Sequence, residues 1–401
     1  MNKAILKTGI QQFIKNNWNT DIVSVLLKKP YFEEVNQKEL VEQLEAKKKC
    51  KDKLPTWFAI PQIYYPKKIH IEQTSSEQTA AYKAEIISGK SLIDITGGLG
   101  VDSYFFSKKF EQVIHCELNK NLSEIALYNF EILGIKNTSC FVKNGLEFLN
   151  YSDKKFDWIF IDPSRRNDTK GKVFLLQDCL PDVPSNLEVI FEKTENVMLK
   201  TSPLLDISQG TSELKFVKEI HVVAIKNEVK ELLWILEKGY QGEIKTKTIN
   251  LQNNQSQKFH FMLSDEKSAV AQTGLPKKYL YEPNAAIMKS GGFKSVSAKF
   301  GLQKIYEHSH LYTSNQLLDF PGRVFKVIGA IPYKKKELKN LGIKKANITT
   351  RNFPESVASL RKMLKIKDGG EDYLFFTTDM NGQRIMISCK KISPNKTDGT
   401  S

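Results

Sequence analysis

Short apolar runs alternate with segments of helical periodicity over the middle of this 401-residue chain. A strand that follows a helix can return to pair in parallel with the strand before that helix. The alternation therefore predicts a doubly wound, parallel α/β sheet. The apolar runs cover 92–96, 112–118, 140–144 and 156–162, and the first helical segments between them cover 101–109 and 121–133.

The same pattern continues beyond residue 190. The last two apolar runs follow one another without a helix, so we expect the sheet to close with an antiparallel hairpin. Further strands are expected at 196–200, 220–226, 243–251 and 258–264, with a helix at 228–238.

The flanking segments have other patterns. Residues 1–53 are expected to form helices at 11–27 and 31–48, after which prolines impose an extended connector. A serine-capped helix is expected at 75–87, and a basic helix at 356–367 within a separate α+β domain. We divide the chain into an N-terminal helical segment with its connector (1–70), the α/β domain (71–270), two small C-terminal segments (275–322 and 323–392) and a frayed tail (393–401).

Composition excludes several classes of protein. No stretch approaches the roughly 20 apolar residues of a membrane span, and the N-terminus has no secretory signal. Five scattered cysteines without a C-x-x-C pair predict reduced thiols, a cytoplasmic location and no metal site. The net charge of +15 favours a polyanionic partner. Nearly all of that charge is lysine in a chain also rich in asparagine and isoleucine, so genome composition explains it equally well.

A glycine-rich turn follows the first strand of the predicted sheet, at Thr96-Gly97-Gly98-Leu99-Gly100. Glycines there allow a tight turn and a close approach of the backbone to a ligand. Glu117, followed by Leu118, ends the second strand, where a carboxylate accepts both hydrogen bonds of a ribose diol. The alternative is an ordinary strand-to-helix turn beside a solvated glutamate. The G-G-x-G spacing lacks the third glycine of a dinucleotide-binding loop, which argues against NAD.

Three further residues near this turn favour S-adenosylmethionine. Asp94 immediately precedes the turn, where an acidic residue would face the methionine amino group. Asn144 and Gly145 end the third strand, where the amide would meet the adenine edge. Ligands bind at this carboxyl edge in open α/β sheets.

The fourth strand delivers Asp162-Pro163-Ser164-Arg165-Arg166 to the same edge. An Asp-Pro motif here is typical of methyltransferases that act on exocyclic amines: oxygen acceptors orient the NH₂ group toward the sulfonium methyl, and alignment accelerates transfer. The alternative is a turn capped by Asp-Pro with two exposed arginines.

Five blocks together resemble the bacterial class I methyltransferases with a THUMP-like C-terminal domain, the PG_1098-like family, whose catalytic part is similar to trimethylguanosine synthase. The resemblance implies a Rossmann-like, seven-stranded class I methyltransferase sheet, a ferredoxin-like segment at 275–322 and a THUMP-like domain at 323–392. The blocks are SSEQTAAYKAE (75–85), DITGGLGVDS (94–103), IDPSRR (161–166), YEPNAAIMKSG (281–291) and ITTRNFPESVASLRKMLKIKDGGEDYLF (348–375).

The resemblance also implies roles for individual residues. Ser76 and Thr79 are expected to close over the cofactor, and Asp102 to approach its methionine end. The implied catalytic motif is Asp162, Pro163, Ser164 and Arg165. This motif departs from that of amine methyltransferases at two positions, because Ser164 replaces a second proline and Arg165 replaces an aromatic residue that would stack on a base. The departures leave the identity of the methylated atom open. The implied cofactor residues also include Asp94, Thr96, Gly97, Gly98, Gly100, Glu117, Leu118, Asn144 and Gly145.

Four residues are candidates for substrate binding. Arg166 is expected to hold a phosphate or stack on a base, and Arg351, Phe353 and Arg361 to contact RNA. In the alternative interpretation Phe353 belongs to the core and the lysines of the basic helix form a solvated face.

These observations predict an S-adenosylmethionine-dependent methyltransferase that acts on a base nitrogen, an exocyclic amine, of rRNA or tRNA. The alternatives are a methyltransferase for a small molecule or a protein, and a non-catalytic RNA-binding protein. The oligomeric state and the role of the N-terminal helices stay open.

Overall fold

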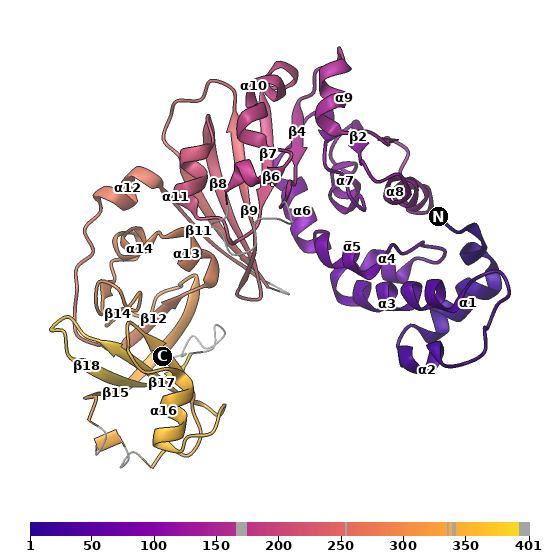
Figure 1. Cartoon of the computed structure of the whole chain (residues 1–401). Helices are drawn as coiled ribbons and strands as arrows, with labels where there is room; N and C mark the ends of the chain where they lie inside the picture. The colour runs from indigo at the N-terminus through magenta and orange to yellow at the C-terminus, as the bar shows by residue number, and fades with distance from the viewer. Residues whose placement is uncertain (166–174, 253–254, 335–336, 339–341, 393–401) are drawn as a thin grey trace, which may run out of the picture. The chain divides into compact units, whose positions relative to one another are not determined.

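The alternating region folds as the parallel core of a sheet, seen in the computed structural model of Figure 1. The structure describes residues 1–165, 175–252, 255–334, 337–338 and 342–392, with only the backbone of Arg165. The parallel strands are β1 (Ser91–Asp94), β2 (Gln112–Cys116), β3 (Thr138–Phe141), β4 (Trp158–Ile161) and β7 (Asn196–Thr201).

Strand order places the topological switch point of the sheet at β1. The order β3-β2-β1-β4-β7 puts β1 between β2 and β4, so the chain changes its direction of travel across the sheet there. Ligands bind outside the carboxyl ends of the strands at such a switch point. The sequence-based strand and helix positions in this region are confirmed to within a few residues. The helices are α6 (Glu77–Ile86), α7 (Val101–Phe106), α8 (Lys120–Ile132), α9 (Gly145–Tyr151), α10 (Val183–Lys193) and α11 (Ile207–Glu213).

The helix expected at 228–238 is wrong. Residues Glu228–Glu237 form strand β9, which lies beside β8 (Val217–Ile225). Lys226 and Asn227 between them both have positive φ, 49° and 65°, as a type I′ hairpin turn requires. The run Leu232–Leu236 is buried throughout, and a helix could not bury five consecutive side chains on one face.

Two more strands complete the sheet. β10 (Lys245–Leu251) pairs in parallel with β8, and β11 (Ser256–Met262) pairs antiparallel with β10 at the edge, as expected. The full order is β11-β10-β8-β9-β7-β4-β1-β2-β3. The Rossmann-like α/β class is confirmed, and the sheet has nine strands where the resemblance implied seven.

The N-terminal helices share a core with the sheet's helices α7 and α8. One buried cluster extends from Ile5 through Trp57 to Phe130. Asn129 on α8 fixes the connector, because its amide oxygen accepts from the Tyr64 N–H (3.0 Å) and its amide nitrogen donates to the Tyr64 carbonyl (2.9 Å). The elements are η1 (Lys3–Leu6), α1 (Thr8–Asn17), α2 (Ile22–Leu26), α3 (Gln37–Lys53), α4 (Pro55–Ala59) and α5 (Lys68–Gln73).

Two expectations for this segment were wrong. The helix expected at 11–27 is interrupted, because Asp21 accepts from the N–H groups of Val23 and Ser24 and caps a new helix. Pro55 begins α4 instead of ending helical structure, since proline at the first helical position has no N–H that would need a partner.

The C-terminal region is an α+β domain with a seven-stranded sheet of order β13-β14-β12-β15-β18-β17-β16. The two C-terminal segments that the sequence analysis treated separately, 275–322 and 323–392, share this one sheet, because β12 pairs directly with β15. The elements are α12 (Leu263–Ser268), β12 (Tyr279–Pro283), α13 (Ala285–Ser290), α14 (Phe293–Phe300), β13 (Gln303–Lys304), β14 (Tyr312–Ser314), β15 (Gly322–Pro332), β16 (Asn347–Arg351), α16 (Val357–Leu364), β17 (Asp372–Thr378) and β18 (Arg384–Lys391).

The chain divides into two compact units, Met1–Lys218 with Leu233–Gln241 and Glu219–Leu232 with Gly242–Ser401. Over the described residues, no helix combines the length and apolarity that a bilayer crossing needs. Within the same residues, no group of three histidine, cysteine or acidic side chains is placed to hold a metal ion.

Candidate functional site

The glycine turn is tied to the end of β2 by two backbone donors. The Gly97 N–H donates to the Cys116 carbonyl (2.8 Å), and the Gly98 N–H donates to Oε2 of Glu117 (2.8 Å). Gly98 and Gly100 have φ of 56° and 82°, a region that favours glycine. These bonds place the turn and the Glu117 carboxylate side by side at the carboxyl edge.

Two of the three glycines are required by packing rather than by an approaching ligand. A Cβ at Gly97 would lie 2.2 Å from Cε1 of His115, and one at Gly100 would lie 2.4 Å from Cζ of Phe130. A Cβ at Gly98 would find its nearest atom, the Thr96 carbonyl oxygen, 3.9 Å away. Only at Gly98 does the absent side chain leave open space beside Glu117.

Glu117 keeps acceptor capacity for a ligand. Its Oε1 accepts from the Asn119 N–H (2.7 Å) and its Oε2 from Gly98, which leaves a second lone pair on each oxygen. Leu118 beside it is 71% exposed, and Phe141 and Val142 at the end of β3 are also exposed. A carboxylate flanked by exposed apolar side chains suits a ribose joined to a base; Phe141 and Val142 were not singled out from the sequence.

Asn144 and Gly145 begin helix α9. The Asn144 side-chain oxygen accepts from the N–H groups of Leu146 (3.0 Å) and Glu147 (3.4 Å), which is a helix cap. A Cβ at Gly145 would lie 2.3 Å from the Ile95 carbonyl oxygen, so α9 can start against β1 only with glycine. The Asn144 oxygen expected at the adenine edge is therefore engaged in its own helix.

Asp94, the residue expected to face the methionine end of the cofactor, is buried next to the turn. It is 1% exposed; its Oδ1 accepts from the Thr96 N–H (3.0 Å) and its Oδ2 from the Ser103 hydroxyl (2.8 Å). Burial raises the pKa of this carboxyl to about 7. These two hydrogen bonds tie the Asp94 carboxylate to the turn and to α7.

His115 joins the same buried cluster, although nothing in its sequence context marked it. Its Nδ1 lies 3.2 Å from the Ser103 hydroxyl, which itself donates to Asp94. Burial lowers the pKa of the imidazole to about 4. The ring is neutral at physiological pH and fills the space that a side chain at Gly97 would need.

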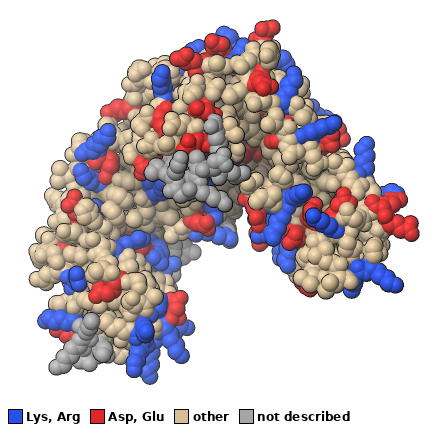
Figure 2. All heavy atoms as spheres, viewed as in Figure 1, with Lys and Arg blue, Asp and Glu red and all other residues tan. Residues whose placement is uncertain are grey.

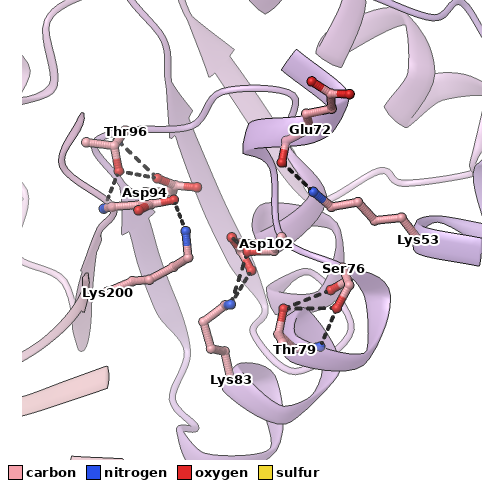
Figure 3. Close-up of polar contacts among 11 residues, drawn as sticks. Lys53, Glu72, Ser76, Thr79, Lys83, Asp94, Thr96, Asp102 and Lys200 are labelled. Carbon is pink, nitrogen blue, oxygen red and sulfur yellow. Dashed lines mark hydrogen bonds and ion pairs between the residues drawn. The ribbon is translucent and has the colours of Figure 1, made fainter. Parts of the chain in front are cut away.

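Ser76 and Thr79, the residues expected to close over the cofactor, hydrogen-bond to each other at the start of α6 (Figure 3). The Ser76 hydroxyl accepts from the Thr79 N–H (3.2 Å), and the Thr79 hydroxyl donates to the Ser76 carbonyl (3.1 Å), as at a helix start. Asp102 pairs with the buried ammonium of Lys83 (3.2 Å) and accepts from the Ser75 hydroxyl (2.7 Å). These contacts fix α6 against α7, next to the turn.

The Asp-Pro motif is linked to the glycine turn and to a lysine. The Asp162 N–H donates to Oγ1 of Thr96 (2.7 Å), and Thr96 Oγ1 also lies 3.4 Å from Oδ1 of Asp94. Lys200, at the end of β7, places its Nζ 2.5 Å from Oδ2 of Asp162. Lys200 was missed; its only signal is a cation near the end of the strand that follows the motif.

The rest of the motif is partly described. Pro163 is half-buried and Ser164 exposed, and the backbone of Ser164 and Arg165 (β5) pairs with Cys179–Leu180 (β6). Arg166 lies outside the described residues.

The three C-terminal candidates for RNA contact have internal partners. Arg351 pairs with buried Glu282 (3.0 Å), which also pairs with Arg323. Phe353 packs edge-on against Tyr333, with ring centroids 4.9 Å apart. Arg361 pairs with Asp368 (2.5 Å) and donates to the Ala346 carbonyl (3.1 Å). Phe353 is partly buried and packs against the buried cluster of this domain.

Comparison with known proteins gives two family matches and an extensive structural similarity. Residues 322–391 match a model described as "THUMP domain-like", and residues 279–321 match one described as a "ferredoxin-like domain". The crystal structure of a "putative methyltransferase" from Porphyromonas gingivalis W83 is similar with a TM-score of 0.88 and 32% identity, covering 98% of this chain and 99% of that one.

More limited similarities cover two fifths of the chain. A "putative methyltransferase" from Streptococcus mutans, solved with S-adenosylhomocysteine, has a TM-score of 0.30 and 14% identity over 40% of this chain and 96% of that one. TrmK of M. capricolum, also solved with S-adenosylhomocysteine, has a TM-score of 0.31 and 17% identity over 40% of this chain and 68% of that one. No protein of curated function matches the sequence.

Proposed function

The chain belongs to the family of bacterial class I methyltransferases with a THUMP-like C-terminal domain, and on that premise we propose that it transfers a methyl group from S-adenosylmethionine to a base nitrogen of RNA. One observation carries the proposal. Glu117 follows β2 and Asp162 follows β4, on the two sides of the glycine turn that follows β1. A carboxylate suited to a ribose and an Asp-Pro motif suited to an amine thus flank one switch point.

S-adenosylmethionine is the cofactor, and the residues at the turn fit it. The open space at Gly98 adjoins the Glu117 carboxylate, which retains lone pairs for two hydroxyl donors. Exposed Leu118, Phe141 and Val142 supply apolar surface for the adenine ring. When bound, the cofactor supplies an electrophilic sulfonium methyl group. Asp94 acts indirectly in this proposal, because it holds the Thr96 N–H and the α7 start in place.

Asp162 accepts a hydrogen bond from the substrate amine in this proposal. Its Oδ2 is engaged by Lys200, so Oδ1 is the oxygen that receives the N–H donor. Lys200 fixes the direction of the carboxylate, and the Thr96 hydroxyl fixes the backbone of Asp162 against the turn. The rate gain then comes from the alignment of the amine lone pair with the methyl group.

RNA is proposed as the substrate because of the positive surface of the THUMP-like domain. Figure 2 shows lysine and arginine side chains gathered at the end of the C-terminal domain that carries α16. Since Arg351 and Arg361 have internal partners, exposed lysines are better placed to contact phosphates. They are Lys344, Lys345, Lys362, Lys365 and Lys367.

The first test is calorimetric titration of S-adenosylhomocysteine into the purified protein. Glu117→Ala is expected to weaken binding about tenfold, or 1.4 kcal/mol, because two ribose hydrogen bonds are lost. Glu147→Ala removes an exposed carboxylate from the first turn of α9 and serves as the matched control. Absence of binding to the wild-type protein would overturn the proposal.

The substrate is tested by methyl transfer from labelled cofactor to total RNA, followed by mass spectrometry of the nucleosides. The Lys362→Ala/Lys365→Ala double variant is expected to slow RNA methylation and to leave S-adenosylhomocysteine binding unchanged. Lys154→Ala/Lys155→Ala is the control, because these exposed lysines precede β4 at the opposite edge of the sheet. Transfer to protein or small molecules in a cell extract, with none to RNA, would assign the activity to those substrates.

A further inference from the structure

A cavity of about 390 Å³ lies among the N-terminal helices. Its walls come from α1, α3, and α4 with the residues that follow α4, all within the first compact unit. Its volume falls within the roughly 300–1,000 Å³ that is usual for small-molecule sites. The rim includes exposed polar side chains, among them Gln12, Lys15 and Gln62, so the cavity is reachable from solvent.

Two aromatic rings form one wall of this cavity. Trp18 and Phe58 meet edge-to-face, with centroids 5.0 Å apart and planes at 88°. Both are partly exposed, unlike Trp57, which is 1% exposed in the core. An ammonium lies near each ring, with Lys47 Nζ 4.7 Å from the Phe58 centroid and Lys51 Nζ 5.0 Å from the Trp18 centroid. A planar ligand would stack on a ring face that these lysines do not cover, and such stacking is tolerant of ring identity.

The electrostatics of the cavity favour an anion. Lys47 is 7% exposed, and its Nζ donates to the Phe58 carbonyl (2.8 Å) and lies 3.1 Å from the Tyr65 hydroxyl. Lys15 lies at the rim, and Lys51 Nζ lies 5.0 Å from the centre of the Trp18 ring. Among the described residues that line the cavity there is no aspartate or glutamate. Burial, with a smaller effect of Lys15, lowers the pKa of Lys47.

We propose that this cavity binds a nucleotide, with the base against Trp18 and Phe58 and the phosphate near Lys15 and Lys51. The side chains of Thr8, Gln12 and Gln62 supply hydroxyl and amide groups that suit the polar edge of a base. The nucleotide is either free or one residue of a single RNA strand. The inference stands apart from methyl transfer, since the residues involved lie outside the glycine turn and the Asp-Pro motif.

The test uses the full-length protein with two probes, adenosine monophosphate and a short fluorescent oligoadenylate, measured by calorimetry and anisotropy. Trp18→Leu removes the stacking face, and Lys15→Met removes a cation from the exposed rim. Each is expected to weaken binding about tenfold. Lys48→Met is the matched control, because Lys48 is the exposed neighbour of Lys47 on α3.

The outcomes distinguish a free nucleotide from an RNA strand as the ligand, and they distinguish this inference from the proposed methyl transfer. Binding of the monophosphate, weakened by both variants, identifies a free-nucleotide site; binding of the oligonucleotide alone, weakened in the same way, identifies a site for an RNA strand. Failure of both probes to bind, or binding that neither variant weakens, overturns the inference. S-adenosylhomocysteine titrated into the same preparations keeps this result separate from the proposed methyl transfer.

Discussion

The ammonium of Lys200 lies 2.5 Å from the carboxylate of Asp162, at the carboxyl ends of two adjacent parallel strands. The register of β4 and β7 aligns Ile161 with Leu199, so the next residues of the two chains are neighbours. This pairing brings a cation from the neighbouring strand to the Asp162 carboxylate. The pair is sheltered, since the Lys200 side chain is only 14% exposed.

Replacing Lys200 is expected to affect turnover more than cofactor binding. Lys200→Met leaves Asp162 without the partner that directs its carboxylate, so methyl transfer should slow about tenfold or more. The affinity for S-adenosylhomocysteine should change less than about twofold. Steady-state kinetics and calorimetry measure the two effects. Lys200→Arg keeps the charge and is expected to retain more activity; equal turnover of Lys200→Met and wild type would exclude the positioning role.

Asp94 and His115 are expected to impose opposite pH dependences on stability. The pKa of Asp94 is raised from 3.8 to about 7 in the fold, so its contribution is complete below 3.8 and is lost as pH rises through 7. The pKa of His115 is lowered from 6.5 to about 4, so its contribution is complete above 6.5 and is lost as pH falls through 4.

Asp94→Asn isolates the first contribution. Relative to wild type, the free energy of unfolding of this variant should increase between about pH 4 and 7, by at most about 1.4 kcal/mol per pH unit. Urea titrations over that range measure the difference. Asp157→Asn is the control of opposite sign, because backbone hydrogen bonds lower the pKa of that carboxyl and its contribution is lost in acid. A pH-independent difference for Asp94→Asn would contradict the buried, protonated carboxyl.

Alanine at the two adjacent glycines is expected to have different consequences. Gly97→Ala places a methyl group 2.2 Å from the His115 ring, which must shift within a packed core, so stability should fall by about 2 kcal/mol or more. Gly98→Ala meets no neighbour but holds alanine at φ 56°, which costs about 1 kcal/mol. Thermal unfolding measures the difference. Cofactor affinity should fall more for Gly98→Ala, because its methyl group enters open space at the proposed cofactor site.

Arg351→Met is expected to destabilise the C-terminal domain rather than to weaken RNA binding directly. The Glu282 side chain is 4% exposed and would keep Arg323 as its one arginine partner among the described residues, a loss of about 1–3 kcal/mol. Urea unfolding monitors the domain, and filter binding monitors RNA at a temperature where the variant is folded. Lys367→Met, at an exposed lysine, is the comparison: it should leave stability unchanged and weaken RNA binding. If Arg351→Met instead left stability unchanged and weakened RNA binding, Arg351 would be assigned to the RNA-binding surface.

The sequence by itself determined the parallel core and the ends of its strands, because both follow from local periodicity. The apolar residues of each strand, for example at 92–96 and 156–162, are close together in the sequence, so each strand can be recognised locally. A residue that directly follows a parallel strand lies at the carboxyl edge of the sheet. Glu117 and Asp162 were therefore placed correctly at one edge. The helix predicted at 228–238 failed because a fully buried strand has no alternation to distinguish it from a buried helix.

Only the tertiary structure decided what the polar side chains contact. Asp94 was predicted to face the cofactor, and the structure adds that Ser103 from α7 and the Thr96 N–H donate hydrogen bonds to its carboxylate. Lys200 meets Asp162 across 38 residues of sequence, and Arg351 meets Glu282 across 69. Such pairs depend on strand order and register, which one sequence does not encode locally. The cavity beside Trp18 likewise depends on tertiary packing, because its walls come from α1, α3 and α4.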